Sequence, residues 1–198
     1  DSGTGFVIAA TGSGKSAMIA AICDIFCRED KKIIVIVPSA DLVEQMMNTF
    51  TLLNIDAGSY SGSNKDLAHA VVVGTWQALQ NNPSVVSSFN CFIVDEAHGA
   101  SAKTIGELIT KHGEHIPYRF GFTGTWPKQE TDQYTLRGSI GDTVYSIDAA
   151  TLIDEGFLSK LEIEPIEIQE LAEEEFPDYA AEKAYISRQP QRLDFIAD

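Results

Sequence analysis

A glycine-rich segment near the start of the sequence has the residue types of a phosphate-binding loop. It reads Ala-Ala-Thr-Gly-Ser-Gly-Lys-Ser over residues 9–16, after a short apolar run and before a stretch of helical periodicity. Glycines let the backbone curl so that successive N–H groups point at phosphate oxygens, and the following helix N-terminus adds partial positive charge. In such a loop Lys15 reaches the β- and γ-phosphates, and the Ser16 hydroxyl binds Mg²⁺. The segment predicts ATP and Mg²⁺ as ligands, held by Thr11, Gly12, Ser13, Gly14, Lys15 and Ser16.

The match to the pattern G-x-x-x-x-G-K-[ST] is incomplete, because Ala9 stands where the first glycine is expected. The alternative is a plain glycine-rich turn before a helix. The Lys-Ser pair that follows the glycines favours the phosphate loop.

Two adjacent acids, Asp95 and Glu96, form a second candidate group 80 residues after Lys15. Four apolar residues precede them, which predicts the carboxyl end of a central strand, where α/β folds bind ligands. There Asp95 would hold Mg²⁺ through an intervening water, and Glu96 would orient and deprotonate the attacking water. The alternative is that the two acids cap the following helix. The phosphate loop upstream favours catalysis, with Lys15, Asp95 and Glu96 as the catalytic residues.

Alternating strands and helices are expected to position these residues. Apolar runs at residues 6–9, 33–37, 71–73, 91–94 and 118–122 are typical of strands buried on both faces. Helical periodicity at residues 15–27, 41–53 and 101–111 lies between them. This order predicts a doubly wound α/β fold whose mostly parallel β-sheet carries helices on both faces. Residues 56–66, rich in Gly, Ser and Asn, are expected to form a surface loop.

Composition excludes several classes of protein. The 198 residues are 44% hydrophobic and 22% charged, so the chain can bury a core. No apolar run approaches membrane-spanning length, and the start carries no secretory pattern, so we expect no membrane partner. Three cysteines without ligand spacing indicate buried thiols in a reducing cytoplasm.

The formal net charge of −15 argues against a broad nucleic-acid surface, because phosphate contacts need cations. Residues 161–198 hold 11 acidic and 3 basic residues, and residues 1–160 hold 18 and 11. Much of the excess therefore lies in the tail. A strand held by backbone amides and hydroxyls at a few points remains compatible with this charge.

Five segments in order resemble the motifs of superfamily 2 helicases. Residues 11–16 and Asp-Glu-Ala-His at 95–98 are similar to motifs I and II. Residues 37–45 (Val-Pro-Ser-Ala-Asp-Leu-Val-Glu-Gln) look like motif Ia, 73–77 (Val-Gly-Thr-Trp-Gln) like motif Ib, and 121–125 (Gly-Phe-Thr-Gly-Thr) like motif III. The resemblance spans most of residues 1–160. It implies an ATP hydrolase that works on nucleic acid.

The resemblance also implies roles for residues outside the nucleotide loop. Motifs Ia and Ib would touch the sugar-phosphate backbone of one strand through Pro38, Ser39, Gln45, Gly74 and Thr75. Thr123 and Thr125 would couple the ATP state to the strand, and His98 would bridge to a partner domain. Trp76 has two open interpretations, a base-stacking residue or a core residue.

Within the superfamily, residues 74–77 and 152–158 resemble the DNA-directed branch, and the nearest likeness is the phage recombination and branch-migration helicases of the UvsW type. This implies a motor that unwinds or migrates branched DNA, in the host cytoplasm if it is phage-encoded. Two alternatives remain, the motor subunit of a restriction enzyme and a non-hydrolysing nucleic-acid-binding module. A small-molecule kinase would have no use for the Asp-Glu-Ala-His segment.

The expected domains are a first RecA-like domain at residues 1–158, and a linker with the opening strand and helix of a second at 159–198. Nothing after Leu158 resembles motifs IV to VI, which supply the arginine fingers in this superfamily. We therefore expect the second RecA-like domain of the same protein as a partner, and little ATPase activity from this segment alone.

Overall fold

Eight strands form one sheet in the order β4-β3-β5-β2-β6-β7-β1-β8. The computed structural model describes residues 3–97, 102–160 and 176–188. All strand pairs are parallel except β3 with β4, which confirms the predicted α/β fold with a mostly parallel sheet. The strands are β1 Gly3–Ala9, β2 Ile33–Val37, β3 Ala57–Ser61, β4 Asn64–Lys65, β5 Val71–Thr75, β6 Cys91–Asp95, β7 Tyr118–Thr123 and β8 Thr143–Ile147.

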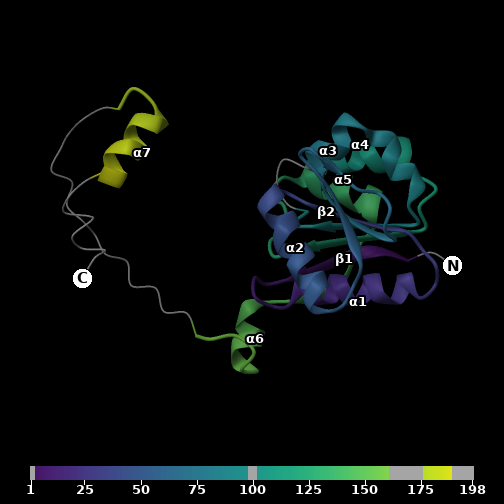
Figure 1. Ribbon diagram of the computed structural model, residues 1–198. Helices are drawn as coiled ribbons and strands as arrows, with labels where there is room; N and C mark the ends of the chain where they lie inside the picture. Colours follow the sequence, from purple (N-terminus) through teal and green to yellow (C-terminus); the bar gives the residue numbers. More distant parts are fainter. Residues whose placement is uncertain (1–2, 98–101, 161–175, 189–198) are drawn as a thin grey trace. The chain divides into compact units, whose positions relative to one another are not determined.

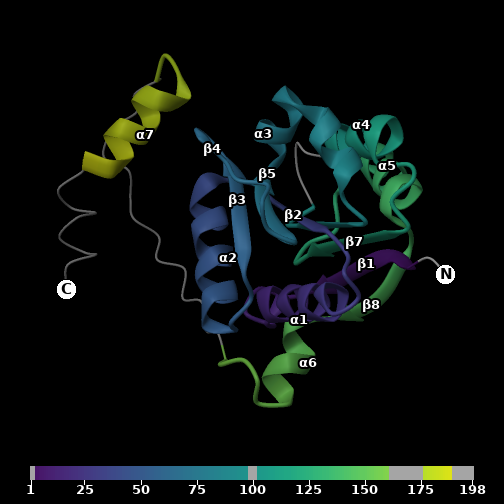
Figure 2. The same cartoon turned by 45° about the vertical axis from the view of Figure 1, so that its right-hand side comes forward.

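Helices cover both faces of this sheet (Figures 1 and 2). On one face lie α1 (Lys15–Cys27) and α2 (Ala40–Leu52). The other face carries α3 (Trp76–Asn81), the 3₁₀ helix η1 (Pro83–Ser88), α4 (Ala102–His112) and α5 (Glu130–Ile140). In β2, Ile34 and Ile36 pack toward α3–α5 while Ile33 and Val35 pack toward α1 and α2. A central strand buried on both faces explains why its sequence is uninterrupted apolar.

The chain divides into two compact units, residues 1–159 and 160–198. The short helix α6 (Ala149–Asp154) follows β8 near the end of the first unit, and α7 (Tyr179–Arg188) lies in the second. Within the linker, strand and helix expected at residues 159–198, residues 161–175 and 189–198 lie outside the described residues. Among the described residues, no helix is long and apolar enough to cross a bilayer.

The prediction of a surface loop at residues 56–66 is wrong. Residues 57–61 form β3, which pairs in parallel with β5, and residues 64–65 form β4. Gly58 and Tyr60 are buried. The segment Ala-Gly-Ser-Tyr-Ser has too few apolar residues to indicate a strand locally, and pairing with the buried strand β5 decides its conformation. The sequence also gave no prediction for α3, α5, α6 or β8.

An Asp-His-Asp cluster ties the β3–β4 hairpin to β5. The Nδ1 atom of His69 lies 2.9 Å from Asp56 Oδ2, and its Nε2 atom lies 3.1 Å from Asp66 Oδ2. Both ring nitrogens can donate only when the imidazole is protonated. The hydrogen bond to Asp56, with the further carboxylate at Asp66, raises the pKa of His69. The cluster joins the residues before β3, after β4 and before β5.

This cluster predicts a pH-dependent contribution to stability. A folded-state pKa above the unfolded value stabilises the fold below the unfolded pKa, and the contribution disappears as pH rises through the folded pKa. His69→Gln should therefore lower the free energy of unfolding more near about pH 6 than near about pH 9, measured by urea unfolding. Asp56→Asn should reduce the same pH dependence. Equal losses at the two pH values for His69→Gln would contradict this assignment.

Candidate active site

The phosphate loop connects β1 to α1 and depends on two glycines. Gly12 and Gly14 have φ angles of +82° and +86°, in the left-handed region that other residues rarely adopt. The N–H group of Ser13 donates to Ala10 O at 3.1 Å, which closes the turn between them. Gly14 is the N-cap residue of α1 and has no side chain to cap it. The first N–H groups of α1 therefore remain as donors for an anion.

Lys15 is held between the loop backbone and the second motif. Its side chain is 9% exposed, and its Nζ atom lies 3.2 Å from Ala9 O and 3.5 Å from Ala10 O. The same Nζ atom lies 3.5 Å from Glu96 Oε1. A buried ammonium needs such partners to replace water. The structure thus brings together two residues that are 81 positions apart in the sequence, as an active site here would require.

The hydroxyl of Ser13 points to what the loop holds. Its oxygen atom is buried and has no hydrogen-bond partner among the described residues. A buried hydroxyl without a partner costs about 1–3 kcal/mol, so this hydroxyl is available to donate to a bound ligand. A phosphate oxygen between curled N–H groups would accept this hydrogen bond. The loop therefore fits a nucleotide phosphate.

Glu96 follows β6 in a strained conformation. Its φ angle is +52°, which a glutamate adopts at a cost of about 1–3 kcal/mol. Two neighbours hold it there: Asp95 Oδ1 accepts the Glu96 N–H group at 3.0 Å, and the Ala97 N–H group donates to Phe122 O at 3.1 Å. The strained turn accompanies the placement of the Glu96 carboxylate beside Lys15.

The third motif packs against the phosphate loop. The hydroxyl of Thr123 donates to Thr125 O at 2.7 Å and accepts from the Thr125 N–H group at 3.2 Å, which fixes the turn after β7. A Cβ atom added to Gly124 would lie 3.5 Å from Lys15 Nζ and 3.6 Å from Thr11 Oγ1. Thr123 is buried and Thr125 is exposed. A conformational change in the phosphate loop would therefore act directly on the turn of motif III.

Ser16 and Asp95 are the candidate residues for holding a Mg²⁺ ion. Magnesium usually keeps several waters and takes one or two protein oxygens together with substrate phosphates. Ser16 is the second residue of α1, beside the loop, and Asp95 ends β6, whose neighbour β7 lies next to β1. Within the described ranges no group of three or more His, Cys, Asp or Glu residues is able to hold a metal ion. These residues therefore suit a Mg²⁺ ion that is also bound by the phosphates of a nucleotide.

Motifs Ia and Ib lie at the same edge of the sheet, at the ends of β2 and β5. Ser39 Oγ accepts from the Leu42 N–H group at 3.4 Å and caps α2, and Thr75 Oγ1 accepts from the Ala78 N–H group at 3.3 Å and caps α3. Because all these strands are parallel, their carboxyl ends share one edge. The nucleotide residues occupy its β6-β7-β1 half, and motifs Ia and Ib occupy its β5-β2 half.

Gln77 also lies at this edge, although it is not among the residues expected to touch a nucleic-acid strand. Its Nε2 atom donates to Pro38 O at 3.2 Å and joins motif Ib to motif Ia. Only the fold could show this bond, because 39 positions separate the two residues. An exposed glutamine after a capping threonine gives no local signal of such a contact.

The five residues selected in motifs Ia and Ib differ in exposure. Gln45 is exposed, Pro38 and Ser39 are half-buried, and Gly74 and Thr75 are buried. A Cβ atom at Gly74 would lie 3.0 Å from Tyr60 O, so this glycine lets β3 approach β5. Trp76 is half-buried and packs against the core on the α3–α5 face, as in its core interpretation. His98 lies outside the described residues.

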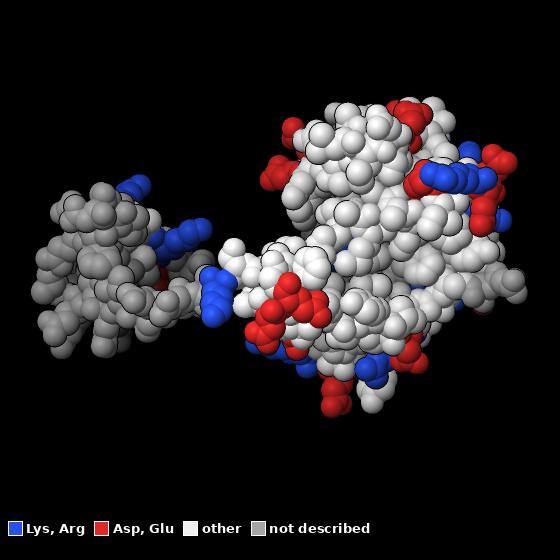
Figure 3. Space-filling model, turned by 90° about the horizontal axis from the view of Figure 1, so that it is seen from below, with Lys and Arg blue, Asp and Glu red and all other residues white. Residues whose placement is uncertain are grey.

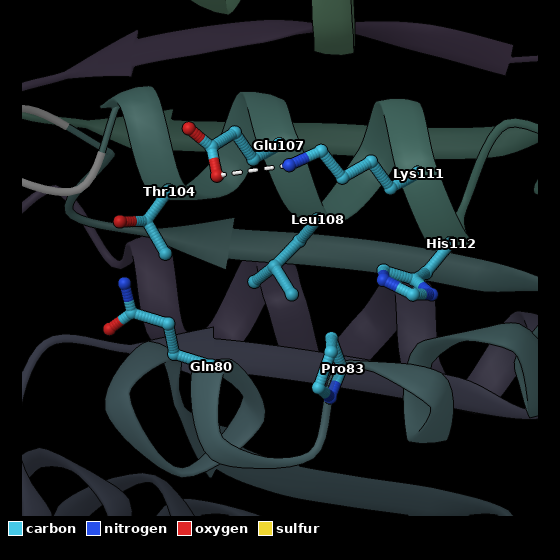
Figure 4. Close-up of a pocket in the computed structure, with 7 residues that line it drawn as sticks. All are labelled: Gln80, Pro83, Thr104, Glu107, Leu108, Lys111 and His112. Atoms are coloured by element: carbon cyan, nitrogen blue, oxygen red, sulfur yellow. Dashed lines mark hydrogen bonds and ion pairs between the residues drawn. The ribbon is translucent and has the colours of Figure 1, made fainter.

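A cavity on the opposite face of the sheet from α1 contains none of these residues (Figure 4). Leu108 and Pro83 face each other across it, and a Glu107–Lys111 ion pair of 3.5 Å lies along one side. Its lining residues are Gln80, Pro83, Thr104, Glu107, Leu108, Lys111 and His112. The nucleotide site is therefore assigned from the geometry of the loop and motif II, and not from this cavity.

The fold and these motifs define a RecA-like ATP-binding domain of the superfamily 2 helicase type. The family described as "Type III restriction enzyme, res subunit" (ResIII) matches residues 1–128. The chain belongs to this family. The comparison with curated proteins gave no match.

Solved helicase structures share the fold. The UvsW helicase from bacteriophage T4 is 24% identical with a TM-score of 0.63, over 72% of this chain and 54% of that chain. The helicase domain of Hef from Pyrococcus furiosus is 18% identical with a TM-score of 0.59, over 72% and 35%. The SWI2/SNF2 ATPase core from Sulfolobus solfataricus, solved with dsDNA, is 16% identical with a TM-score of 0.57, over 70% and 31%. This chain therefore spans about half or less of the length of these proteins.

Proposed function

We propose that this chain is the ATP-binding half of a motor that couples ATP hydrolysis to unwinding or branch migration of DNA. The observation that carries the proposal is the contact between Lys15 and Glu96, 3.5 Å apart, with motif III packed against the same lysine. Family membership supports the helicase or translocase class. The likeness to the fold of UvsW and of a SWI2/SNF2 core solved with dsDNA favours DNA as the partner.

Each residue of the site has a role in ATP hydrolysis. The Ser13 hydroxyl and the loop N–H groups bind phosphate oxygens, and Lys15 exchanges its contacts with Glu96 and the loop carbonyls for the phosphates. Glu96, released from Lys15, orients the attacking water and accepts its proton. Ser16 and Asp95 would hold Mg²⁺, which when bound neutralises charge on the phosphate oxygens. Thr123 and Thr125 transmit the state of the loop toward the strand.

Lys15→Ala tests the nucleotide site. It removes the ammonium group that contacts the loop carbonyls, and we expect ATP and ADP binding to the chain to become undetectable by calorimetry. Lys111→Ala is the matched control, because Lys111 is an exposed lysine on α4 that pairs with Glu107. Nucleotide affinity that is equal in the two variants would contradict the proposed site.

The nucleic-acid strand is proposed to lie along motifs Ia and Ib. Pro38, Ser39 and Gln45 offer accessible groups there, with Gly74 and Thr75 shaping the edge beneath them. The face of the first unit seen in Figure 3 is largely uncharged, and its few lysine and arginine side chains are scattered among acidic ones and form no continuous basic patch. Binding would then rest on backbone amides and hydroxyls more than on cations.

This arrangement predicts a shallow salt dependence. The slope of log affinity against log salt concentration scales with the number of released counterions, about 0.7 for each phosphate contact on a single strand. We expect labelled single-stranded DNA to bind the chain weakly, with a slope that corresponds to few contacts. The measurement is a titration across a salt series. Tight binding with a slope that demands about six or more cation contacts would contradict this picture.

A restriction-enzyme motor is the second candidate, and the description of the matching family favours it. It would use the same ATP site and differ by an attached nuclease. A nuclease domain in the sequence that adjoins this chain would decide for it, and a second RecA-like domain with no nuclease would decide for a helicase. In both cases we propose a second RecA-like domain as partner, and the cytoplasm as location because Cys23, Cys27 and Cys91 are free thiols.

A further inference from the structure

The chain that follows the last strand begins beside the phosphate loop. Strand β8 runs parallel to β1, and its register pairs Ile147 with Ala9, the residue that ends β1 and opens the loop. Asp148 then caps α6, with its Oδ1 atom accepting the Thr151 N–H group at 2.7 Å. The start of α6 is thus fixed at the point where the loop starts.

The end of α6 turns back toward the same loop. Gly156 has a φ angle of +80°, and the N–H groups of Phe157 and Leu158 both donate to Leu152 O, at 2.8 and 3.0 Å. Leu152 is itself buried, so the residue that accepts both hydrogen bonds is held in place by the core. Of the two residues that it presents, Phe157 is 75% exposed, whereas Leu158 is half-buried.

The Leu158 side chain lies against the tip of the phosphate loop. A Cβ atom at Gly12 would lie 3.0 Å from Leu158 Cδ2. Gly12 is therefore required for two reasons, its left-handed φ angle and the leucine methyl group beside it. A loop with two glycines is costly to order, and a side chain packed on it before nucleotide arrives lowers the ordering cost of binding.

We propose that Leu158 is a positioning residue for the phosphate loop, which it holds in its nucleotide-binding shape by packing on Gly12. This inference rests on the proposed nucleotide site. An apolar side chain makes no bond to a phosphate, so Leu158 acts only through the loop. Gly12 and Leu158 both lie in the first unit, residues 1–159.

The test compares nucleotide dissociation from the 198-residue chain and three variants. For Leu158→Ala we expect dissociation of a fluorescent ADP analogue to be about three- to tenfold faster, because a loop without this contact leaves its nucleotide-binding shape more readily. Leu158→Met should restore the parental rate by refilling the contact. Phe157→Ala is the control for its neighbour, and its exposed ring should leave the rate unchanged.

Amide hydrogen exchange of residues 11–14 gives a second readout that does not need nucleotide. Exchange there should be faster in Leu158→Ala than in Phe157→Ala, while the central strands stay equally protected in both. Dissociation and loop exchange equal in Leu158→Ala and Phe157→Ala would overturn the proposal, as would tighter binding by Leu158→Ala. If the parental chain binds no nucleotide, the proposed function fails, whereas the exchange comparison still decides whether Leu158 orders the loop.

Discussion

Glu96→Gln should reduce ATP turnover by about 10²–10⁴-fold while ATP stays bound, since general-base catalysis contributes about that much. The amide keeps the size of the side chain but accepts no proton. It also removes the negative partner of Lys15, whose Nζ atom keeps its contacts with Ala9 O and Ala10 O. The lysine is then easier to transfer to the phosphates, so we expect ATP affinity equal to or above the parental value.

The measurement pairs single-turnover hydrolysis with equilibrium nucleotide binding, in a protein with its second RecA-like domain. Glu107→Gln is the matched control, because Glu107 is an exposed glutamate on α4, paired with Lys111 and outside the motifs. It should leave both quantities unchanged. Parental hydrolysis by Glu96→Gln would show that another group activates the water.

The 198-residue chain alone should hydrolyse ATP about 10³–10⁵-fold more slowly than a protein that adds the second RecA-like domain, the factor that an arginine finger contributes. Two of its own arginines are engaged elsewhere. Arg28 pairs with Asp24 at 2.6 Å, and Arg137 lies 3.7 Å from Asp142 and against the Trp126 ring. Neither belongs to the phosphate loop or to motif II.

The comparison is a steady-state assay of the two proteins at equal nucleotide saturation. Nucleotide binding should be retained by the short chain, because Lys15 and the loop lie entirely within its first unit. If the short chain binds ATP but hydrolyses it slowly, nucleotide binding does not need the second domain, whereas fast hydrolysis needs the positive charge of its arginine finger. Equal turnover by the two proteins would mean that residues 1–198 already contain every catalytic group.

The two chemistry-bearing segments could be predicted from the sequence because their signals are local. Glycines before Lys-Ser indicate a curled loop, and two acids after an apolar run indicate a strand end, whatever the rest of the chain does. The same holds for buried strands such as β2, where an uninterrupted apolar run predicts a strand that is buried on both faces. Such patterns predicted the α/β fold, and they selected the residues that we propose for the site.

Contacts between distant segments depended on the fold. Strand β3 exists because β5 lies beside it, and Gln77 reaches Pro38 because β5 and β2 are neighbours. No local pattern indicates the left-handed turn at Glu96, which neighbouring strands hold against its own conformational preference. Residue types and spacing near each motif determined what chemistry this chain carries. Sheet pairing, which joins residues far apart in sequence, decided that Lys15 meets Glu96 and that Leu158 rests on Gly12.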